Sequence, residues 1–464
     1  MQKAEIGVIG LAVMGANLAR NLARHNKTVV FNRTTEKTTE FINKFGSENL
    51  TGSKTLKEFT ANLSTPRKII MMVKSGDPVD QFIAKLLPHL SKNDILIDGG
   101  NSLYTDTIRR QQDLKKKGIH FIGMGISGGE EGALNGPSMM PGGDKNAYKK
   151  LEKILIPSAA SDGLKGTCVS YIGNSGSGHF VKMVHNGIEY GVMQLIAEIY
   201  NVLKQLGKFT NQELSKAFAD YNKTVNSFLL EITAKIFKEK LPDSEKHLID
   251  FIKDTAGQKG TGKWTTIAAL NYGVAIPTIN AAVDARILSG DIEQRAKSKS
   301  RPISLNKSKL PNKKELQNIA KSALELSTLI AYHQGFKLIE QANKEHNWNL
   351  NLSEIARIWR GGCIIRSNYL DLFQNIYKPD TTKKANEMAL SKFKGKAQKN
   401  WRQLVELASA HGIPLPAISA SLNYYDSLCQ ARLPQSLIQA QRDFFGAHTY
   451  ERTDKKGIFH TNWK

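Results

Sequence analysis

The first third of the chain alternates short apolar runs with longer amphipathic segments. The apolar runs, mostly bounded by Gly, Asn or Asp, are Ile6–Ile9, Thr28–Phe31, 68–73, Ile95–Asp98 and 121–123. Helix-length segments such as 15–25 and 105–117 lie between them. Because strands that alternate with helices form a parallel sheet covered on both faces, this pattern predicts an α/β domain built on a parallel sheet.

The pattern changes at a Gly- and Ser-rich stretch at 173–178. Long amphipathic segments follow, for example 179–206 and 313–345, and strand signals become few. The last residues show no clear periodicity. We therefore expect a Rossmann-like domain at 1–176, a large all-α domain at 177–433 and a C-terminal tail at 434–464.

The composition is that of a globular protein with a sizeable core. Of 464 residues, 40% are hydrophobic and 23% are charged. The net charge of +23 favours an anionic partner, such as nucleic acid, an acidic membrane or a phosphorylated small molecule. Many basic residues lie at 295–314, where Pro and Ser indicate a solvated loop rather than a polyanion site. Composition alone does not choose among these partners.

The cysteines and the N-terminal residues indicate the cellular compartment in which the protein is expected. Cys168, Cys363 and Cys429 are scattered, which disfavours a disulfide framework or a Cys-rich zinc site and indicates a reducing compartment. The N-terminus lacks the features of a secretory signal, and no apolar run reaches the roughly 18 residues of a membrane span. We expect a soluble cytoplasmic protein that binds no membrane.

A Gly-containing turn follows the first predicted strand and opens a helix. Its residues are Gly10, Leu11, Ala12, Val13, Met14 and Gly15. Gly10 allows the tight turn, Gly15 lets the helix approach the strand, and the helix N-terminus offers free amides to a pyrophosphate. Ala12 replaces the middle Gly of the general motif, and one methyl group there need not block the ligand. The motif is weak alone, but its place at the first strand–helix turn predicts a dinucleotide site.

The residues after the second predicted strand indicate which dinucleotide binds. This strand ends at Asn32, Arg33 and Thr34, where such domains contact the ribose. An NAD enzyme usually has a carboxylate here, whereas Arg33 suits the 2′-phosphate of NADP. The alternative is a surface arginine in a turn. Lys74 lies at the carboxyl end of a later strand, where ligands of open sheets collect.

A polar stripe runs along the first long helical segment. Lys182, His185, Asn186 and Glu189 share one face at 100° per residue, and apolar residues cover much of the rest. Lys182 and Glu189 lie roughly 10 Å apart along the axis, too far for a salt bridge but suited to bracket a small substrate. A buried lysine can act as a base and a buried carboxylic acid can donate a proton. The alternative is a solvated face.

With these motifs in view, the sequence resembles the 6-phosphogluconate dehydrogenase family over essentially its whole length. Ala12 is the usual residue in that family's turn. The matching stretches are GLAVMG at 10–15, NRT at 32–34, DGGN at 98–101, SGGE at 127–130, MMPGG at 139–143, KMVHNGIEYG at 182–191, AGQKGTGKWT at 256–265, ARIWRGGCIIR at 356–366 and QRDFFGAHTYE at 441–451.

The resemblance implies NADP-dependent oxidation of 6-phosphogluconate and decarboxylation to ribulose 5-phosphate, in the oxidative pentose phosphate pathway. It implies Lys182 as general base, Glu189 as general acid and no metal, which agrees with the lack of a ligand cluster in the sequence. It assigns the cofactor to 10–15, Asn32, Arg33, Thr34, Val73, Lys74, Ser75 and Asn101. It assigns the substrate to Asn101, Ser127, Gly128, Gly129, His185, Asn186, Tyr190, Lys259, Thr261 and Arg286.

The resemblance also implies a homodimer whose subunits exchange their tails. Arg442 and His448 would then complete the substrate site of the neighbouring subunit, and the helical domain would bind substrate and form the dimer. On the residues alone, His185 can be a structural histidine, and Lys259 and Arg286 can be solvated charges. Gly128 and Gly129 are expected to turn the chain and aim backbone amides at the substrate carboxylate. Trp264 and Trp359 fit a core better than a cofactor contact.

Two other functions compete with this interpretation. Another β-hydroxyacid dehydrogenase, acting on a short unphosphorylated acid, would end soon after one helical region, so the extra helices and the tail argue against it. A nucleic-acid-binding protein would fit the net charge of +23. However, the positive charge is spread along the chain and no helix-turn-helix, RRM or zinc-finger signature is present, so we expect no nucleic acid.

Overall fold

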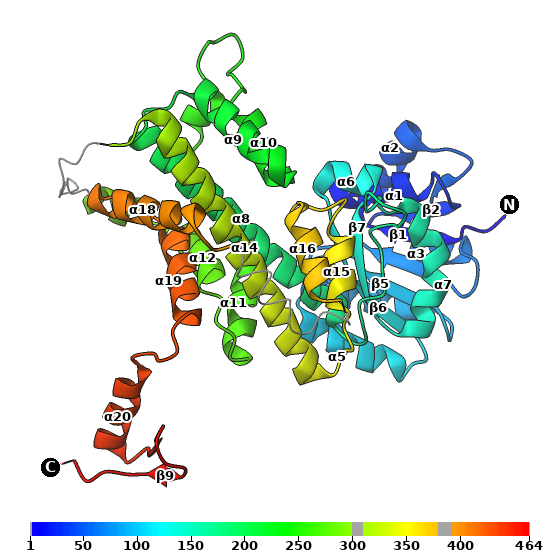
Figure 1. Ribbon diagram of the computed structural model, residues 1–464. Coiled ribbons are helices and arrows are strands. Elements are labelled where there is room, and N and C mark those ends of the chain that lie inside the picture. The colour runs from blue at the N-terminus through cyan, green and yellow to red at the C-terminus, as the bar shows by residue number, and fades with distance from the viewer. Residues whose placement is uncertain (1, 299–309, 379–391, 464) are drawn as a thin grey trace.

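The computed structural model describes residues 2–298, 310–378 and 392–463. An α/β part at the N-terminal end lies against a larger helical part, and the C-terminal segment projects from the helical part (Figure 1). The predicted fold class is therefore confirmed. Among the described residues, no helix combines the length and the apolar character of a membrane span. Residues 299–309 of the basic stretch lie outside the described residues.

The α/β part is built on one seven-stranded sheet. The strand order is β3-β2-β1-β4-β5-β6-β7, and only β7 runs antiparallel to its neighbour. The strands are β1 Ile6–Ile9, β2 Thr28–Phe31, β3 Leu50–Gly52, β4 Lys68–Met71, β5 Ile95–Asp98, β6 His120–Ser127 and β7 Ser138–Gly143. Because both faces are covered, the central strands are almost entirely apolar.

Helices cover both faces of this sheet. They are α1 Val13–Leu22, α2 Thr35–Phe45, α3 Leu56–Ala61, α4 Asp77–Leu86, α5 Tyr104–Lys115, α6 Gly129–Asn135 and α7 Lys145–Leu155. Leu18 of α1 and Tyr148 of α7 belong to the apolar cluster on one face. Phe59, Val79 and Leu114 of α3, α4 and α5 belong to the cluster on the other face.

Two strands were not expected, and one is longer than expected. β3 is a short edge strand whose residues are mostly not buried, so it carries little apolar signal. β7 contains Pro141, Gly142 and Gly143, which are typical of a turn, yet it pairs at the other edge of the sheet, where Pro is tolerated. β6 extends from His120 to Ser127 rather than over 121–123, and its two glycines concealed the extra length.

The helical part packs around one large apolar core. Its helices are α8 Ser177–Gln205, α9 Asn211–Val225, α10 Phe228–Ile236, α11 Thr261–Asn271, α12 Pro277–Gly290, α13 Ile292–Lys297, α14 Lys313–His346, α15 Leu352–Ile358, α16 Tyr369–Ile376, α18 Lys396–Ala410 and α19 Pro416–Leu428. The long helices α8 and α14 run side by side through its centre (Figure 1). Trp359 is fully buried in this core, and Trp264 packs partly buried against it.

The first turns of α8 lie directly on β6 and β7, so this helix belongs to both parts of the molecule. Glycines allow the close approach. A Cβ atom on Gly125 of β6 would lie 2.3 Å from Cβ of Lys182, and one on Gly142 of β7 would lie 2.3 Å from the amide of Gly178. These contacts place the polar stripe of α8 at the junction of the two parts.

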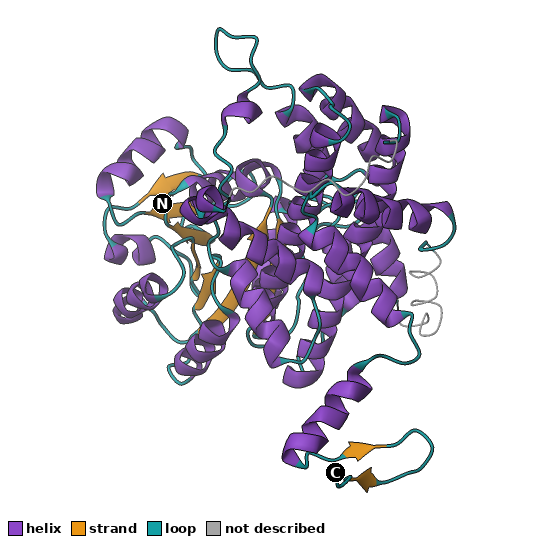
Figure 2. Ribbon diagram, turned by 90° about the vertical axis from the view of Figure 1, so that its left-hand side faces the viewer, coloured by secondary structure: helices purple, strands orange, loops and turns teal. Residues whose placement is uncertain are grey.

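The C-terminal tail contains regular structure that the sequence did not reveal. Helix α20 (Gln435–Gly446) and the hairpin of β8 (Tyr450–Glu451) and β9 (Ile458–Phe459) stand away from the body (Figures 1 and 2). The tail folds around Asp443, which is fully buried and accepts hydrogen bonds from Thr449, His460, Thr461 and Trp463. A short element organised by polar contacts leaves little hydrophobic periodicity in the sequence.

Candidate active site

The polar stripe of α8 is buried at its N-terminal end and opens at Glu189. Lys182, His185 and Asn186 are buried, whereas the Glu189 side chain is 22% exposed. Nζ of Lys182 donates to Oδ1 of Asn186, and His185 Nδ1 lies 3.1 Å from the same oxygen. His185 Nδ1 also lies 3.9 Å from Oε2 of Glu189. The four side chains therefore form one connected row, as the helical spacing predicted.

His185 joins the helix to the sheet. Its Nε2 lies 3.2 Å from the hydroxyl oxygen of Ser127, the last residue of β6. Its ring packs nearly perpendicular to the buried indole of Trp359, with 5.4 Å between centroids. Trp359 in turn donates from Nε1 to the sulfur of Met140 in β7. His185 is thus held on both sides, which is a structural role in addition to any contact with a ligand.

Burial moves the pKa values of Lys182 and Glu189 toward their neutral forms. Desolvation lowers the pKa of Lys182, and the Glu189 charge opposes this shift. Desolvation raises the pKa of Glu189, and the charges of Lys182 and Arg286 oppose this shift. A lysine with a lowered pKa can accept a proton, and a carboxylic acid with a raised pKa can donate one. Lys182 and Glu189, two helical turns apart on α8, are therefore suited to serve as a base and an acid.

Arg286 and the start of α11 lie beside this row. The Arg286 guanidinium stacks on the ring of Tyr190 at 3.5 Å from its centroid. A Cβ atom on Gly262 would lie 2.5 Å from the same ring, so α11 approaches α8 closely there. The hydroxyl of Thr265 donates to the carbonyl of Met183 in α8. Arg286 is thus the cation beside Glu189 at the open end of the row, and Lys259 is exposed just ahead of α11.

Ser127, Gly128 and Gly129 form the sheet-side wall. Gly128 and Gly129 have φ values of 115° and 63°, the left-handed region that favours glycine, and α6 begins at this turn. A Cβ atom on Gly128 would lie 2.7 Å from the carbonyl oxygen of Gly362. That carbonyl also accepts from the amide of Ser138. The turn therefore packs tightly against the loop that follows α15, and only glycine fits.

The turn after β1 has the shape expected of a dinucleotide site. Gly10 has a φ of 96°, and a Cβ atom on it would lie 2.4 Å from the carbonyl oxygen of Met72. A Cβ atom on Gly15 would lie 1.9 Å from the carbonyl oxygen of Gly10. No side chain caps the N-terminus of α1, and Val13 there is 55% exposed. The free amides of α1 are thus open to an anionic ligand.

Asn32 has a role that the sequence did not reveal. Its Oδ1 accepts from the amide of Leu11, and its Nδ2 donates to the carbonyl of Thr34. The side chain therefore ties the turn after β1 to the turn after β2. Arg33 is exposed beside this junction, where its guanidinium is free to reach a ligand.

Two further loops end at the same edge of the sheet. Val73, Lys74 and Ser75 follow β4, and Asn101 follows β5. Lys74 and Asn101 are exposed. Both loops therefore face the edge at which ligands of open α/β sheets bind.

A buried polar network, which sequence reasoning missed, fixes these two loops. Asp98 accepts from the amide of Gly100 and the hydroxyl of Ser102. The buried Arg110 donates to the carbonyl of Gly76 at 3.0 Å and lies 3.6 Å from Asp98. His179 of α8 lies 3.1 Å from the carbonyl oxygen of Asp98. The only signal in the sequence was an Asp directly before two glycines.

Arg442 and His448 are the site residues that this chain does not bring to the rest. Both are exposed on the tail, which projects away from the body and from α8 (Figure 1). Arg442 contacts Gln439 within its own helix.

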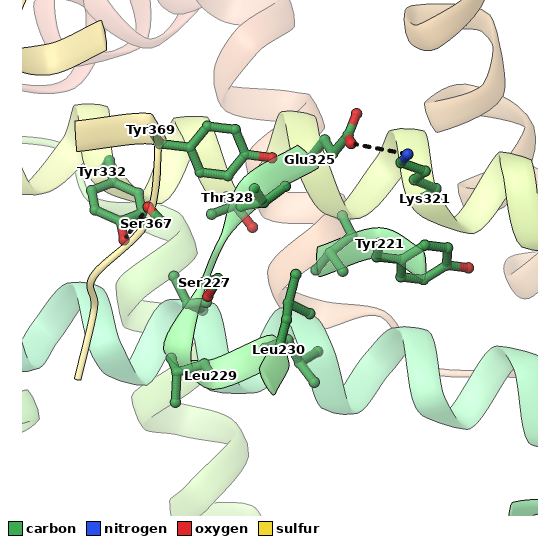
Figure 3. A pocket seen from close by; sticks show the side chains of 14 residues that line it. Tyr221, Ser227, Leu229, Leu230, Lys321, Glu325, Thr328, Tyr332, Ser367 and Tyr369 are labelled. Carbon is green, nitrogen blue, oxygen red and sulfur yellow. Dashed lines mark hydrogen bonds and ion pairs between the residues drawn. The ribbon is translucent and has the colours of Figure 1, made fainter. Parts of the chain in front are cut away.

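The cavity among the helices in Figure 3 is not a competing substrate site. A cavity between α8, α9, α14 and α16 is lined by Tyr221, Glu325 and Tyr369 among others (Figure 3). Its volume of about 20 Å³ admits about one water molecule, too little for a substrate. In the described part of the chain, no group of three or more His, Cys, Asp or Glu side chains is placed to hold a metal ion.

Sequence comparisons identify the family. Residues 5–173 match the family model described as the NAD binding domain of 6-phosphogluconate dehydrogenase, and residues 178–463 match that of its C-terminal domain. The chain belongs to the 6-phosphogluconate dehydrogenase family. The resemblance predicted from the sequence motifs is therefore confirmed.

Individual relatives of this family align over the full length. The chain is 50% identical over 475 residues to a Bacillus subtilis protein named "6-phosphogluconate dehydrogenase, NADP(+)-dependent, decarboxylating", with all of both chains covered. It is 48% identical to the human 6-phosphogluconate dehydrogenase, covering 100% of this chain and 97% of that protein. The solved Plasmodium falciparum 6-phosphogluconate dehydrogenase superimposes with a TM-score of 0.92 at 43% identity, covering 99% of this chain and 100% of that one.

The buried histidine of this row should make the stability of the protein sensitive to acid. Burial and the Lys182 charge hold the pKa of His185 well below its ordinary value, so the folded protein keeps it neutral while the unfolded chain protonates it. The contribution of His185 to the free energy of unfolding is therefore fully present above about pH 6.5. Below that pH it is lost at roughly 1.4 kcal/mol per pH unit, the value for one such group. When the pH is lowered from 7.5 to 5.5, the Tm of the wild type should fall further than the Tm of a His185→Gln variant. A His25→Gln variant, which removes an exposed imidazole, is the control. An equal fall in Tm for wild type and His185→Gln would contradict this prediction.

Proposed function

We propose that this enzyme oxidises 6-phosphogluconate with NADP+ and decarboxylates the product to ribulose 5-phosphate. The observation that carries the proposal is the pair of the buried Lys182 and the partly buried Glu189 on one face of α8, whose pKa values move in opposite directions. The Bacillus subtilis relative is named for this activity, and the Plasmodium falciparum structure was determined with NADP+ and with 6-phosphogluconate. The dehydrogenase class and the NADP cofactor predicted from the sequence agree with the family.

Lys182 acts as the general base in the oxidation. Bound NADP+ supplies the hydride acceptor. As the hydride leaves the carbon next to the one that bears the carboxylate, the neutral amine of Lys182 takes the proton of the hydroxyl group on the oxidised carbon. The product is a β-keto acid. Asn186 and His185 contact the amine, which orients it for this transfer.

Lys182 and Glu189 then share the decarboxylation. When carbon dioxide leaves, the electron pair moves onto the new ketone and gives an enediolate. The protonated Lys182 stabilises the negative charge on its oxygen. Glu189, whose pKa is raised by desolvation, gives its proton to the carbon that lost carbon dioxide. The reaction needs no metal, because Lys182 performs the charge stabilisation.

The surrounding side chains hold the two ends of the substrate. At the carboxylate end we assign Asn101, Ser127, Gly128 and Gly129, with His185 and Asn186 on the hydroxyl groups. The left-handed turn at Gly128 supports this assignment, because such turns expose backbone amides to anions. At the phosphate end we assign Tyr190, Lys259, Thr261 and Arg286, whose cationic members suit a dianion.

The residues at the carboxyl edge of the sheet fit NADP. The uncapped α1 receives the pyrophosphate, as its exposed N-terminus supports. Arg33, with Asn32 and Thr34, receives the 2′-phosphate. We assign Val73, Lys74, Ser75 and Asn101 to the nicotinamide half of the cofactor. The domain division at residue 176 and the cytoplasmic location stay predictions.

We further propose a homodimer in which each tail enters the neighbouring subunit. Arg442 and His448 would complete the phosphate end of the partner's site. The projecting tail supports this arrangement, since it exposes large apolar side chains that a partner would cover. These include Leu437, Ile438, Phe444, Phe445 and Ile458.

The activity is tested by the absorbance of NADPH formed from NADP+ and 6-phosphogluconate. Wild type should turn over this substrate and not unphosphorylated gluconate. Glu189→Gln should lower kcat by about a hundredfold or more with little change in KM, because the amide cannot donate the proton. The exposed Glu406→Gln serves as the matched control. Turnover of gluconate alone would exclude the proposed substrate, and wild-type turnover in Glu189→Gln would exclude Glu189 as the acid.

The role of Arg33 is tested by reversing its charge. Arg33→Asp should raise the KM for NADP+ by about tenfold or more, because a charge-assisted contact is lost, while the KM for NAD+ changes little. Lys37→Asp makes the same change of charge on the exposed face of α2 and controls for long-range effects. Equal changes for both cofactors would show that Arg33 acts only on the structure.

The exchanged tail is tested by mixing two inactive variants. Lys182→Ala and Arg442→Ala should each lose activity as homodimers. In a mixed dimer, one site combines the intact Lys182 of one subunit with the intact Arg442 of the other. Co-expression should therefore restore roughly a quarter of wild-type activity, because half of the randomly assembled dimers are mixed and each has one intact site. If the mixture stays inactive, each tail serves its own subunit.

A further inference from the structure

The segment 252–259, which leads into Lys259, has no regular structure and is exposed along its length. The preceding element is the short helical turn Leu248–Phe251, and α11 follows at Thr261. A chain of this kind has no fixed path unless other groups hold it. Within the described part of the chain, its hydrogen bonds go to one place, the corner between α12 and α13.

Ser289 and Arg286 hold the middle of the segment. The amide of Ala256 donates to the Ser289 hydroxyl at 2.9 Å, and this hydroxyl donates to the carbonyl of Arg286 at 2.7 Å. The Arg286 guanidinium donates to the carbonyl of Gly257 at 3.2 Å. A side-chain hydroxyl thus satisfies a backbone amide that has no partner in a helix or strand.

Arg295 holds the start of the segment and braces the corner. One nitrogen of its guanidinium donates to Asp254 at 2.7 Å, and the other donates to the carbonyl of Ser289 at 3.1 Å. The hydrogen bond from Arg295 lowers the pKa of Asp254, so the pair is charged at neutral pH. Arg295 therefore links the segment to the residue that binds Ala256.

The other end of the segment is fixed on α8. Thr261 is buried, and Thr265 one turn later bonds to α8 through its hydroxyl. Between Gly257 and Thr261 only three residues remain, with Lys259 at their centre. Because this short span is held at both ends, the backbone of Lys259 has little conformational freedom, although its side chain is exposed.

We propose that Ser289 and Arg295 are positioning residues for the phosphate end of the substrate, acting by holding the segment that presents Lys259. This inference rests on the proposed function. Neither side chain touches the substrate. Their contacts hold Lys259 in position before the substrate binds, so that substrate binding does not have to order the segment.

The inference is tested by a Ser289→Ala/Arg295→Gln double variant, which removes the contacts to Ala256 and Asp254 and leaves Arg286 in place. The KM for 6-phosphogluconate should rise about fivefold or more, the ratio expected for losing one ordinary hydrogen bond. The kcat and the KM for NADP+ should stay within about twofold, because this interaction is made equally in ground state and transition state.

A charge exchange and a matched control separate positioning from general destabilisation. Arg295→Asp alone should raise the substrate KM, and Asp254→Arg/Arg295→Asp should recover part of the loss by restoring the pair. Arg402→Gln removes the exposed Arg402–Asp426 pair between α18 and α19 and should leave every constant unchanged. An unchanged substrate KM in the Ser289→Ala/Arg295→Gln variant, or an equal rise in both KM values, would overturn the proposal.

Limited trypsin digestion tests the same contacts without any substrate. Cleavage after Lys259, followed by mass spectrometry, should be several times faster in the Ser289→Ala/Arg295→Gln variant than in wild type, with cleavage elsewhere unchanged. Equal cleavage after Lys259 would show that the corner does not hold the segment. If wild type fails to oxidise 6-phosphogluconate while the cleavage rates differ as expected, then the proposed function is wrong and the restraint on the segment stands.

Discussion

The site depends on the close approach of α8 to the sheet. Lys182 lies where its Cβ atom would meet a side chain on Gly125, so only a glycine in β6 lets the helix settle there. The same condition applies where Gly142 meets Gly178. Because α8 also forms the centre of the helical part, this contact joins the two parts and brings the row of Lys182, His185, Asn186 and Glu189 to the sheet.

Burial at this junction shifts the pKa values of Lys182 and Glu189, and it also removes polar groups from water, which costs free energy. Removing an amine and a carboxyl group from water disfavours their charged forms, which lowers the pKa of Lys182 and raises that of Glu189. The hydrogen bonds among Lys182, His185, Asn186 and Ser127 partly replace the lost water. The open end of the row at Glu189 lies near Arg286, whose positive charge opposes the rise in the pKa of Glu189.

In the proposed function, the phosphate end of the site has less regular secondary structure than the helix that carries Lys182 and Glu189. Its cations lie on an exposed segment, on α12 and, in the proposed dimer, on the tail of another subunit. Such groups keep a fixed position only through contacts outside regular secondary structure, of which the α12–α13 corner and the Asp443 cluster of the tail are two examples. Loops held on a rigid scaffold commonly carry binding residues in this way.

The sequence by itself determined the α/β followed by helical architecture, the turn at Gly10 and Gly15 and the shared face of Lys182, His185, Asn186 and Glu189. These features depend on local periodicity and on residues a few positions apart, which a sequence displays directly. Only the tertiary structure decided that this face is buried rather than solvated, since that depends on glycines of β6 and β7 far away in the chain. The sequence also did not predict β7, the Asp98–Arg110–His179 network or the restraint on the Lys259 segment. Each depends on contacts between residues whose separation in sequence carries no periodic signal.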